Sequence, residues 1–388
     1  MSNTLLIDSM KSFFLTSSTL DCAFRIEQLR KLADAIARHE TRLHNALYAD
    51  LHKSPPDAYT SETGYIQREI RYTLKNIRRW SRPRRVSVPA LLQPARAHVV
   101  PEPKGVVLII GPWNYPVQLV LSPLVAAIAA GNCAIIKPSE LTPNCSAALR
   151  ELIEETFQPD YIRLMEGGRD VAEQLLKQPV DHIFFTGGTE TGRAVAQAAA
   201  RQLIPVTLEL GGKNPVVIGT DCDLKVAARR IARGKWMNAG QLCVAPDHVW
   251  IPRNLQSDFI QQMNETLRDF YGSNPQQSPD YGRIINAQHI DRLVSLYPPV
   301  IHDKKDLYLA PTLILDPPRD SLLMRDEIFG PLLPILAYDT EQEIIDSYKN
   351  RPAPLALYLF IRNPSQRLRF MTAISSGGVC INDTVTQL

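Results

Sequence analysis

Short apolar segments alternate with amphipathic segments through the first half of the chain, and this alternation limits the fold more than any other feature. The predicted strands after Gly105 are 106–110, 133–136, 162–165 and 183–185. The predicted helices that separate and follow them are 118–130, 143–157, 170–177 and 189–201. Short apolar strands joined by helices are typical of a parallel sheet with right-handed crossovers. The sequence therefore predicts an α/β fold with a doubly wound parallel sheet.

The remaining parts of the chain extend this organisation. After Val206 the pattern predicts strands at 214–218, 249–251 and 356–360 and helices at 223–238, 254–270 and 341–349. Residues 1–80 have apolar side chains every three to four positions, which indicates helices. Residues 86–100 alternate weakly and contain two prolines, which favours an exposed hairpin or arm.

A basic run, Arg78-Arg79-Trp80-Ser81-Arg82-Pro83-Arg84-Arg85, lies between the helical region and this arm. It is open to two interpretations: a polyanion-binding patch around an aromatic ring, or the charged end of a helix that Pro83 stops. We favour the helix end because no second basic stripe accompanies the run.

Composition excludes several classes of function. The 388 residues have a formal net charge of +3, which is too small to indicate nucleic acid as a partner. The six cysteines are scattered without Cys-x-x-Cys pairs or histidine clusters, so we expect no metal site and a reduced, cytoplasmic setting. The uncharged stretch 117–136 is broken by Pro123 and by Gly131-Asn132, which favours a buried helix and strand over a membrane span, and no secretory signal is recognisable.

Two segments could bind a cofactor. Gly187 and Gly188 follow a predicted strand and open a helix, where backbone N–H groups attract a pyrophosphate, although a simple helix cap by Thr189 fits equally well. Lys137 and Glu140 lie at the carboxyl end of another strand, where ligands of open α/β sheets bind. They could hold ribose hydroxyls, or form only a solvated ion pair on a turn.

A second group of residues suits carbonyl chemistry. Cys243 lies in Gly240-Gln241-Leu242-Cys243, and Glu209 lies upstream beside two glycines that would give it freedom to move. A thiolate can attack a carbonyl, and a carboxylate can activate first the thiol and then water. Asn114, at a strand end between two prolines, could donate to a developing oxyanion or only form a turn. Cys133 and Cys380 lie in apolar runs and are predicted to be core residues.

Taken together, these motifs resemble the aldehyde dehydrogenase superfamily, and its class 3 branch in particular, over essentially the whole chain. The matching motifs are Gly111-Pro112-Trp113-Asn114-Tyr115-Pro116, Lys137-Pro138-Ser139-Glu140, Phe185-Thr186-Gly187-Gly188-Thr189, Glu209-Leu210-Gly211-Gly212-Lys213-Asn214-Pro215, Gly240-Gln241-Leu242-Cys243 and Glu327-Ile328-Phe329-Gly330-Pro331. The resemblance implies NAD(P)-dependent oxidation of an aliphatic or aromatic aldehyde to the acid through a cysteine thioester.

The resemblance also implies a role for each matching residue. Cys243 would be the nucleophile, Glu209 the general base and Asn114 the oxyanion donor. The residues implied to bind the cofactor are Trp113, Lys137, Glu140, Thr186, Gly187, Gly188, Glu327 and Phe329. Lys137 and Glu140 would hold the adenosine ribose, and Glu327 and Phe329 the nicotinamide ribose and ring. A carboxylate at position 140 favours NAD, with NADP possible.

The implied architecture is two Rossmann-like parallel-sheet domains with a small arm. Residues 1–81 and 99–207 would bind NAD(P), 82–98 would form an oligomerisation arm, and 208–388 would form the catalytic domain. A homodimer without membrane anchoring is the implied assembly.

One departure from the class 3 pattern bears on activity. Relatives continue past the position of Asp383 with a Pro-Phe-Gly-Gly segment that this chain lacks. Two alternatives to an active dehydrogenase therefore stay open: a catalytically impaired descendant that still binds the cofactor, and an esterase that needs no cofactor.

Overall fold

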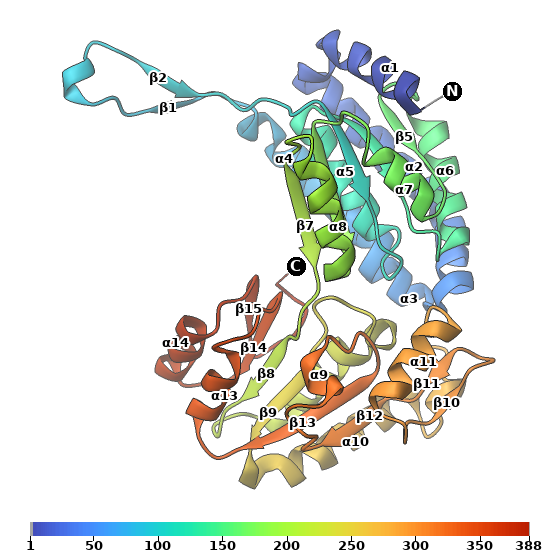
Figure 1. The fold of residues 1–388 in the computed structure, drawn as a ribbon, viewed down its shortest axis with the longest axis vertical. Helices are drawn as coiled ribbons and strands as arrows, with labels where there is room; N and C mark the ends of the chain where they lie inside the picture. The colour runs from blue at the N-terminus through green and yellow to red at the C-terminus, as the bar shows by residue number, and fades with distance from the viewer. Residues whose placement is uncertain (1–2, 388) are drawn as a thin grey trace. The chain divides into compact units, whose positions relative to one another are not determined.

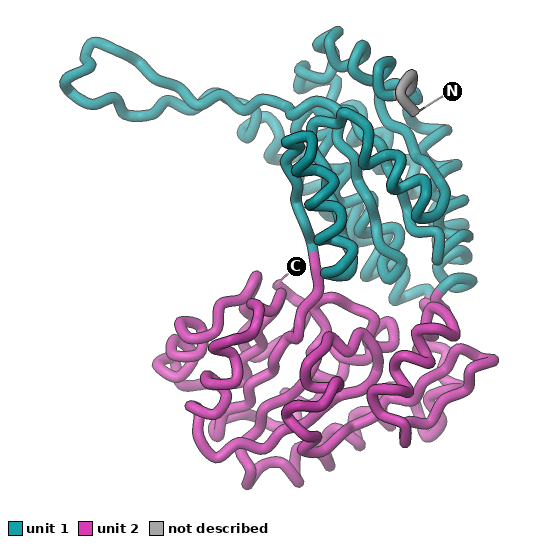
Figure 2. Tube along the Cα trace, viewed as in Figure 1, with its two compact units in different colours: residues 1–50, 55–209 teal, residues 51–54, 210–388 magenta. Residues whose placement is uncertain are grey.

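The computed structural model describes residues 3–387, which form two compact units. Unit 1 comprises residues 1–50 and 55–209, and unit 2 comprises residues 51–54 and 210–388 (Figure 2). The division lies near the predicted boundary at 207/208. The assignment of cofactor binding to one unit and catalysis to the other stays a prediction.

A five-stranded sheet forms the centre of unit 1, with the strand order β5-β4-β3-β6-β7 (Figure 1). Its strands are β3 (Val106–Ile110), β4 (Cys133–Lys137), β5 (Ile162–Leu164), β6 (His182–Gly187) and β7 (Val206–Leu210). β3 and β4 are buried along their whole length, which explains why both read as uninterrupted apolar runs. The chain leaves β3 in one direction to β4 and β5 and returns to its other side at β6, so the sheet has a switch point between β3 and β6.

Helices flank this sheet at the predicted places. The helices that connect its strands are α5 (Gln118–Ala130), α6 (Pro143–Thr156), α7 (Arg169–Leu175) and α8 (Thr189–Ala200). The N-terminal region supplies α1 (Asn3–Leu15), α2 (Cys22–Leu51), the short α3 (Pro55–Ala58) and α4 (Gly64–Trp80). Gly131 ends α5 in a left-handed conformation (φ 87°), as glycine does at many helix ends. α4 ends at Trp80, which confirms the helix-end interpretation of the basic run.

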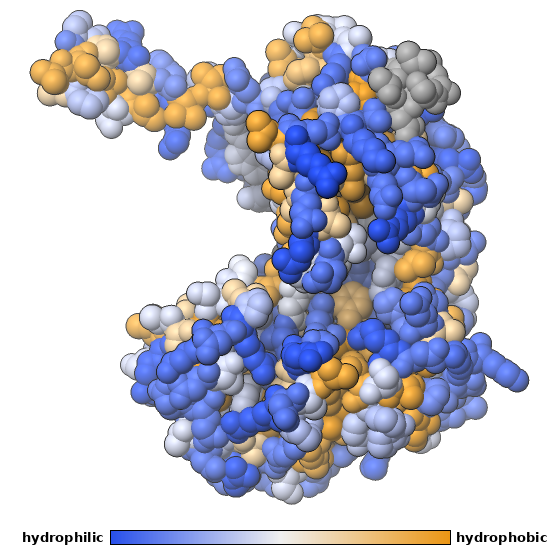
Figure 3. Space-filling model, in the orientation of Figure 1, coloured by the Kyte–Doolittle hydropathy of each residue, from blue (hydrophilic) through white to orange (hydrophobic). Residues whose placement is uncertain are grey.

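The predicted arm is an antiparallel hairpin that projects from the rest of unit 1 (Figure 1). Its strands β1 (Arg84–Val86) and β2 (Ala97–Val99) pair with Arg84 opposite Val99. Apolar side chains gather at its tip (Figure 3), where Leu91 is 94% exposed. The hairpin is confirmed, whereas its role in oligomerisation stays a prediction.

A six-stranded sheet forms the centre of unit 2, with the order β12-β13-β9-β8-β14-β15 and parallel pairing throughout. Its strands are β8 (Pro215–Ile218), β9 (His248–Pro252), β12 (Thr312–Leu315), β13 (Leu332–Tyr338), β14 (Ala356–Phe360) and β15 (Gly378–Ile381). The sequence pattern did not predict β12, β13 or β15. Pro331 and Pro334 argue against a central strand at this position in the sequence. β13 is nevertheless buried along its length between strands β12 and β9.

The helices of unit 2 include three that the pattern missed. The predicted helices appear as α9 (Leu224–Trp236), α10 (Gln256–Tyr271) and α13 (Glu341–Tyr348). α11 (Ala287–Leu296), the short α12 (Leu322–Arg325) and α14 (Pro364–Ala373) were not predicted. A small hairpin of β10 (His302–Asp303) and β11 (Tyr308–Leu309) follows α11.

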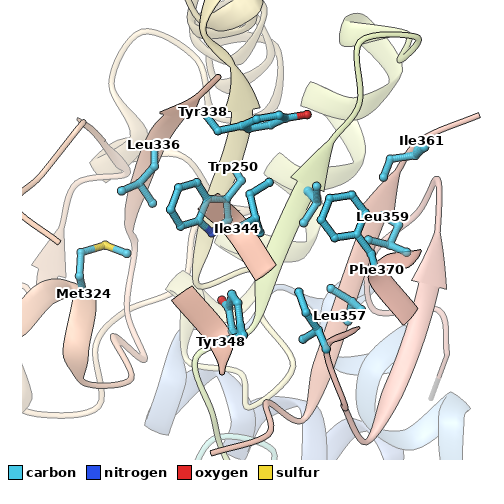
Figure 4. Packing of buried hydrophobic residues seen from close by; sticks show 12 residues of the cluster. Trp250, Met324, Leu336, Tyr338, Ile344, Tyr348, Leu357, Leu359, Ile361 and Phe370 are labelled. Carbon is cyan, nitrogen blue, oxygen red and sulfur yellow. The ribbon is translucent and has the colours of Figure 1, made fainter. Parts of the chain in front are cut away.

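One apolar cluster shows how helices cover a face of the unit 2 sheet (Figure 4). Trp250 of β9, Leu336 of β13 and Leu357 of β14 supply the sheet side of this cluster. Ile344 of α13 and Phe370 of α14 are fully buried against them. Within a strand, the residues of the cluster recur at every second position, as Leu336 and Tyr338 do in β13. This spacing places their side chains on one face of the sheet.

Two structural observations concern membranes and metals. None of the described helices is both long and apolar enough to cross a membrane, and the uncharged stretch 117–136 forms α5 and β4. Residues 3–387 contain no group of three or more His, Cys, Asp or Glu side chains that could hold a metal ion.

Candidate functional site

The loop that carries Asn114 lies at the carboxyl end of β3 in unit 1. Asn114 is only 3% exposed, and the N–H of Gly111 fixes the start of the loop by donating to the carbonyl of Lys137 at 3.0 Å. The end of the loop is fixed by the buried carboxylate of Glu62, which accepts from the N–H groups of Val117 (3.1 Å) and Gln118 (2.6 Å). Glu62 therefore caps the start of α5, a role that the sequence pattern did not suggest.

Lys137 and Glu140 form an ion pair of 2.7 Å at the end of the neighbouring strand β4. The Lys137 side chain is 4% exposed and the Glu140 side chain 46%, so this is not the fully solvated pair of the alternative interpretation. Partial burial would raise the pKa of Glu140, but the hydrogen bond from Lys137 and the positive charge outweigh it and lower the pKa. The half-exposed carboxylate is therefore ionised and able to accept a hydroxyl.

The segment after β6 has the properties of a phosphate site. The N-cap of α8 is Gly188 and not Thr189, and no side chain caps the helix. A ligand that binds the first N–H groups of the helix therefore does not compete with a capping side chain. A Cβ atom at Gly188 would meet no atom within 4 Å, so the backbone is open to a ligand. The hydroxyl of Thr186 is buried and finds no hydrogen-bond partner among the described residues. A buried, unpaired hydroxyl beside an open glycine suits a ligand that brings its own polar groups.

Glu209 is an exposed residue of the edge strand β7. The structure offers a reason for one of the glycines after it. Gly211 does not have a positive φ, but a Cβ there would lie 2.2 Å from Oε2 of Glu327. Position 211 must therefore lack a side chain so that the Glu327 carboxylate can approach.

Cys243 lies in unit 2 on a loop with an unusual backbone. Asn238, Ala239 and Gly240 all have positive φ, at 51°, 52° and 77°. A Cβ at Gly240 would come within 2.3 Å of the carbonyl oxygen of Gly330, so this glycine permits a close approach of two loops. Strained backbone of this kind persists where surrounding contacts determine it, and functional sites often contain it.

Two buried amides hold the Cys243 loop, and the sequence pattern missed both roles. Asn214 donates to the carbonyls of Cys243 (2.8 Å) and Ala245 (3.0 Å) and accepts from the N–H of Ala356. Gln241 donates to the carbonyl of Arg283 at 2.9 Å. A polar amide directly before a buried strand, as in Lys213-Asn214-Pro215, is the signal that could have identified Asn214.

The cysteines differ in burial in the way the sequence predicted. Cys133 and Cys380 are buried, which confirms them as core residues, whereas the Cys243 side chain is partly exposed. Burial raises the pKa of the Cys133 thiol to about 12, and it does the same for Cys222. Neither is therefore a thiolate near neutral pH.

Glu327 and Phe329 share a loop between α12 and β13. The N–H of Gly212 donates to Glu327 Oε1 at 3.2 Å. Burial raises the pKa of Glu327 to about 7, although this N–H group and the positive charges of Arg292 and Lys213 oppose the increase. The carboxyl group of Glu327 thus titrates near neutrality, which is uncommon for a glutamate and frequent at functional sites.

The predicted site residues therefore form two groups, one in each unit. In unit 1, Trp113 and Asn114, Lys137 and Glu140, and Thr186 to Gly188 lie at the carboxyl ends of β3, β4 and β6, which are adjacent in the sheet. Glu209 belongs to the same unit and lies near the end of the edge strand β7. In unit 2, the loops of Cys243 and Glu327 approach each other through Gly240 and Gly330.

Comparisons with known proteins give one consistent result. The model of the aldehyde dehydrogenase family matches residues 5–388. The chain is 46% identical over 386 residues to the 4,4′-diaponeurosporen-aldehyde dehydrogenase of Staphylococcus aureus, covering 97% of this chain and 84% of the relative. It is 44% identical to mouse aldehyde dehydrogenase family 3 member A2, covering 97% and 79%. A solved structure, the substrate-bound state of Staphylococcus aureus AldH, superposes with a TM-score of 0.95 at 45% identity and covers 98% of this chain and 85% of that one.

Proposed function

Because the chain belongs to the aldehyde dehydrogenase family, we propose that it oxidises an apolar aliphatic or aromatic aldehyde to the acid with Cys243 as the nucleophile. Membership of this family supports the oxidation of an aldehyde, and an NADP-preferring relative and an NAD-bound structural neighbour support a nicotinamide cofactor. The residue roles, the choice between NAD and NADP and the substrate are the proposed part.

In the proposed reaction the Cys243 thiolate attacks the aldehyde carbonyl and forms a thiohemiacetal. The Asn114 amide donates a hydrogen bond to the oxyanion, a contribution of about 2.7–4 kcal/mol where such a donor has been removed. The nicotinamide supplies a hydride acceptor when it is bound. The resulting Cys243 thioester is hydrolysed by water from which Glu209 removes a proton, and this releases the acid and restores the thiol.

The residues of unit 1 fit a dinucleotide. The uncapped start of α8 and the open Gly188 suit a pyrophosphate, and the unpaired hydroxyl of Thr186 can bond to the same ligand. The ionised, half-exposed Glu140 can accept from a ribose hydroxyl and would repel a 2′-phosphate, which favours NAD over NADP. Glu327 and Phe329 are proposed to contact the nicotinamide ribose and ring.

The observation that carries the proposal is the way the Cys243 loop is held, because partial exposure alone does not distinguish Cys243 from Cys22 and Cys222. Cys243 is partly exposed on a loop that two buried amides and three left-handed residues hold in place. A thiol that only fills the core, such as Cys133, needs none of these features. The strained backbone and the buried hydrogen bonds of this loop support a functional role for Cys243.

The test is the formation of NADH or NADPH by the purified chain with a panel of aldehydes. The panel should include aliphatic and aromatic aldehydes and the aldehyde named for the Staphylococcus aureus relative. Turnover that Cys243→Ala abolishes and that Cys222→Ala, the matched control, retains supports the proposal. Equal turnover by the Cys243→Ala variant would refute the role of Cys243. Cofactor binding without any turnover by the wild-type chain would instead indicate a catalytically impaired descendant.

The arm supports a proposal about assembly. Leu91 and Leu92 are 94% and 60% exposed at its tip, and apolar side chains presented in this way usually have a protein partner. We expect a homodimer, which light scattering of the purified chain would detect. A monomer at micromolar concentration would contradict this expectation.

A further inference from the structure

The loop from Asp326 to Pro331 carries both residues proposed for the nicotinamide end of the cofactor. Its backbone is strained at Phe329, which has a φ of 47° although it is neither glycine nor asparagine. A bulky residue keeps this conformation only where surrounding contacts impose it. The question is which contacts do so.

A buried ion pair supplies several of these contacts. The ammonium group of Lys213 donates to the carboxylate of Asp247, and the two side chains are 9% and 4% exposed. The same ammonium group donates to the carbonyls of Leu323 (2.7 Å) and Asp326 (3.0 Å), which precede the loop residues Glu327 and Phe329. Lys213 thus binds both helix α12 and the first residue of the loop.

Asp247 holds the next residue of the loop. Its Oδ2 accepts from the N–H of Ile328 at 2.9 Å, and Ile328 lies between the two residues that face the cofactor in the proposed function. Arg292 of α11 donates to the carbonyls of Ile328 (2.8 Å) and Phe329 (3.3 Å). Charged side chains therefore bind both the N–H and the carbonyl groups of the backbone around Phe329.

The ion pair is charged despite its burial. Burial alone would raise the pKa of Asp247, but Lys213 and contributions from His248 and Lys235 hold it well below the usual range of a carboxyl group. His248 is itself buried, and burial lowers its pKa to about 4, so it is neutral at physiological pH. A buried ion pair gives little net stability compared with apolar side chains of similar size. Its retention therefore needs another explanation, and the geometry offers one.

We propose that Lys213 and Asp247 are positioning residues that act as one bracket, which holds the Glu327–Phe329 segment in the conformation needed for cofactor-dependent hydride transfer. The inference rests on the proposed function, because it concerns the residues assigned to the nicotinamide end of the cofactor. It gives a role to the lysine of Gly211-Gly212-Lys213, which no step of the proposed reaction uses. An apolar pair could fill the same volume, but it could not bind the Ile328 N–H and the Asp326 carbonyl.

The proposal separates two activities of the same site. Hydride transfer needs the bracketed segment, whereas hydrolysis of an activated ester by Cys243 and Glu209 needs no cofactor. Asp247→Asn keeps the side-chain volume and one acceptor oxygen but removes the charge that Lys213 pairs with. Misplacement of reacting groups by about 1 Å costs about a hundredfold in rate. We expect the variant to lose tenfold to a hundredfold in NAD-dependent oxidation and to show a raised KM for NAD, with p-nitrophenyl acetate hydrolysis within about twofold of the wild-type rate.

Three further variants make the experiment specific. Lys213→Arg retains the charge and should keep most of the oxidation rate, whereas Lys213→Met should reproduce the loss. Asp339→Asn removes a carboxylate from the exposed ion pair Arg253–Asp339 of the same unit and serves as the matched control, with wild-type rates expected in both assays. Hydrogen exchange of the peptide spanning residues 326–331 should be faster in Asp247→Asn than in the wild type, because the asparagine amide no longer forms the ion pair with Lys213 that anchors the acceptor of the Ile328 N–H.

The outcomes distinguish the possible explanations. Oxidation that stays at the wild-type rate in Asp247→Asn would overturn the proposal, and so would a parallel fall of oxidation and ester hydrolysis, which indicates a general structural defect. If the wild-type chain oxidises no aldehyde, the proposed function fails, and the bracket is then judged by hydrogen exchange alone. Unchanged exchange at residues 326–331 would overturn it in that case as well.

Discussion

Replacement of Gly211 by alanine tests whether the position of the Glu327 carboxylate matters for turnover. A Cβ built at position 211 lies 2.2 Å from Oε2, 2.3 Å from Oε1 and 2.5 Å from the carboxyl carbon of Glu327. Ordinary van der Waals contact begins at 3.4 Å, so the whole carboxylate must retreat by about 1.2 Å or rotate away. Since a displacement of about 1 Å can cost about a hundredfold in rate, the expected loss of transition-state stabilisation is about 2.7 kcal/mol.

The assay for Gly211→Ala is steady-state NADH formation with the cofactor and the aldehyde varied in turn. We expect kcat/KM for NAD to fall about a hundredfold while the melting temperature changes little, because the new methyl group displaces a side chain and not the backbone. Gly168→Ala is the matched control, since a Cβ there meets only Oδ1 of Asp170 at 3.3 Å. Wild-type kinetics in Gly211→Ala would show that the carboxylate position seen here is not the one that turnover uses, and the reasoning would fail.

Three further predictions follow from single carboxylates. Because burial raises the pKa of Glu327 to about 7, the ionised form that accepts a hydroxyl is lost as the pH falls below 7. The affinity for NAD, measured by fluorescence titration, should therefore fall with the pH. The variant Glu327→Gln should bind NAD more weakly than the wild type, and its affinity should not change with pH in this range. The sign for stability is opposite, since a carboxyl whose folded pKa is raised stabilises the fold most at low pH and loses that contribution between about pH 4.5 and 7. Glu62→Ala removes the acceptor at the start of α5 and should lower the free energy of unfolding by about 1–3 kcal/mol in urea denaturation; a change below 0.5 kcal/mol, roughly the size of a surface substitution, would contradict the capping role. Glu140→Gln should raise the use of NADP relative to NAD, and an unchanged ratio of the two kcat/KM values would show that this carboxylate does not face the 2′-position.

Local signals were sufficient for most of unit 1. Strands β3 and β4 of its sheet are short apolar runs next to glycine or proline, and α6 and α8 are amphipathic, whereas α5 is apolar almost throughout. The edge strand β7, which carries Glu209, was not predicted. The hairpin at 84–99 could also be predicted, because weak alternation with prolines suits an exposed ribbon. In unit 2 the same reasoning missed β13. This strand contains Pro334 and still pairs with both flanking strands, β12 and β9.

The candidate site shows the same division between motif and environment. Cys243, Glu209 and Asn114 could be proposed because each belongs to a short motif whose chemistry is legible in sequence. The residues that hold the loops of Asn114 and Cys243 could not be predicted in this way. Glu62 lies 55 positions from the N–H group of Val117 that it binds, and Asn214 lies 29 positions from the carbonyl of Cys243.

The sequence alone determined the α/β class, the order along the chain of strands β3 to β6 and of the helices between them, the arm and the identity of the candidate nucleophile. These features depend on periodicity and on residue types within short windows, which are local properties of the chain. Only the tertiary structure decided that Asp247 binds both Lys213 and the N–H of Ile328, that the carboxylate of Glu327 occupies the space beside Gly211, and that burial raises the pKa of Glu327 to about 7. These features depend on which distant segments pack together and on how much water they exclude. Neither can be deduced from residue types within a short window of the sequence.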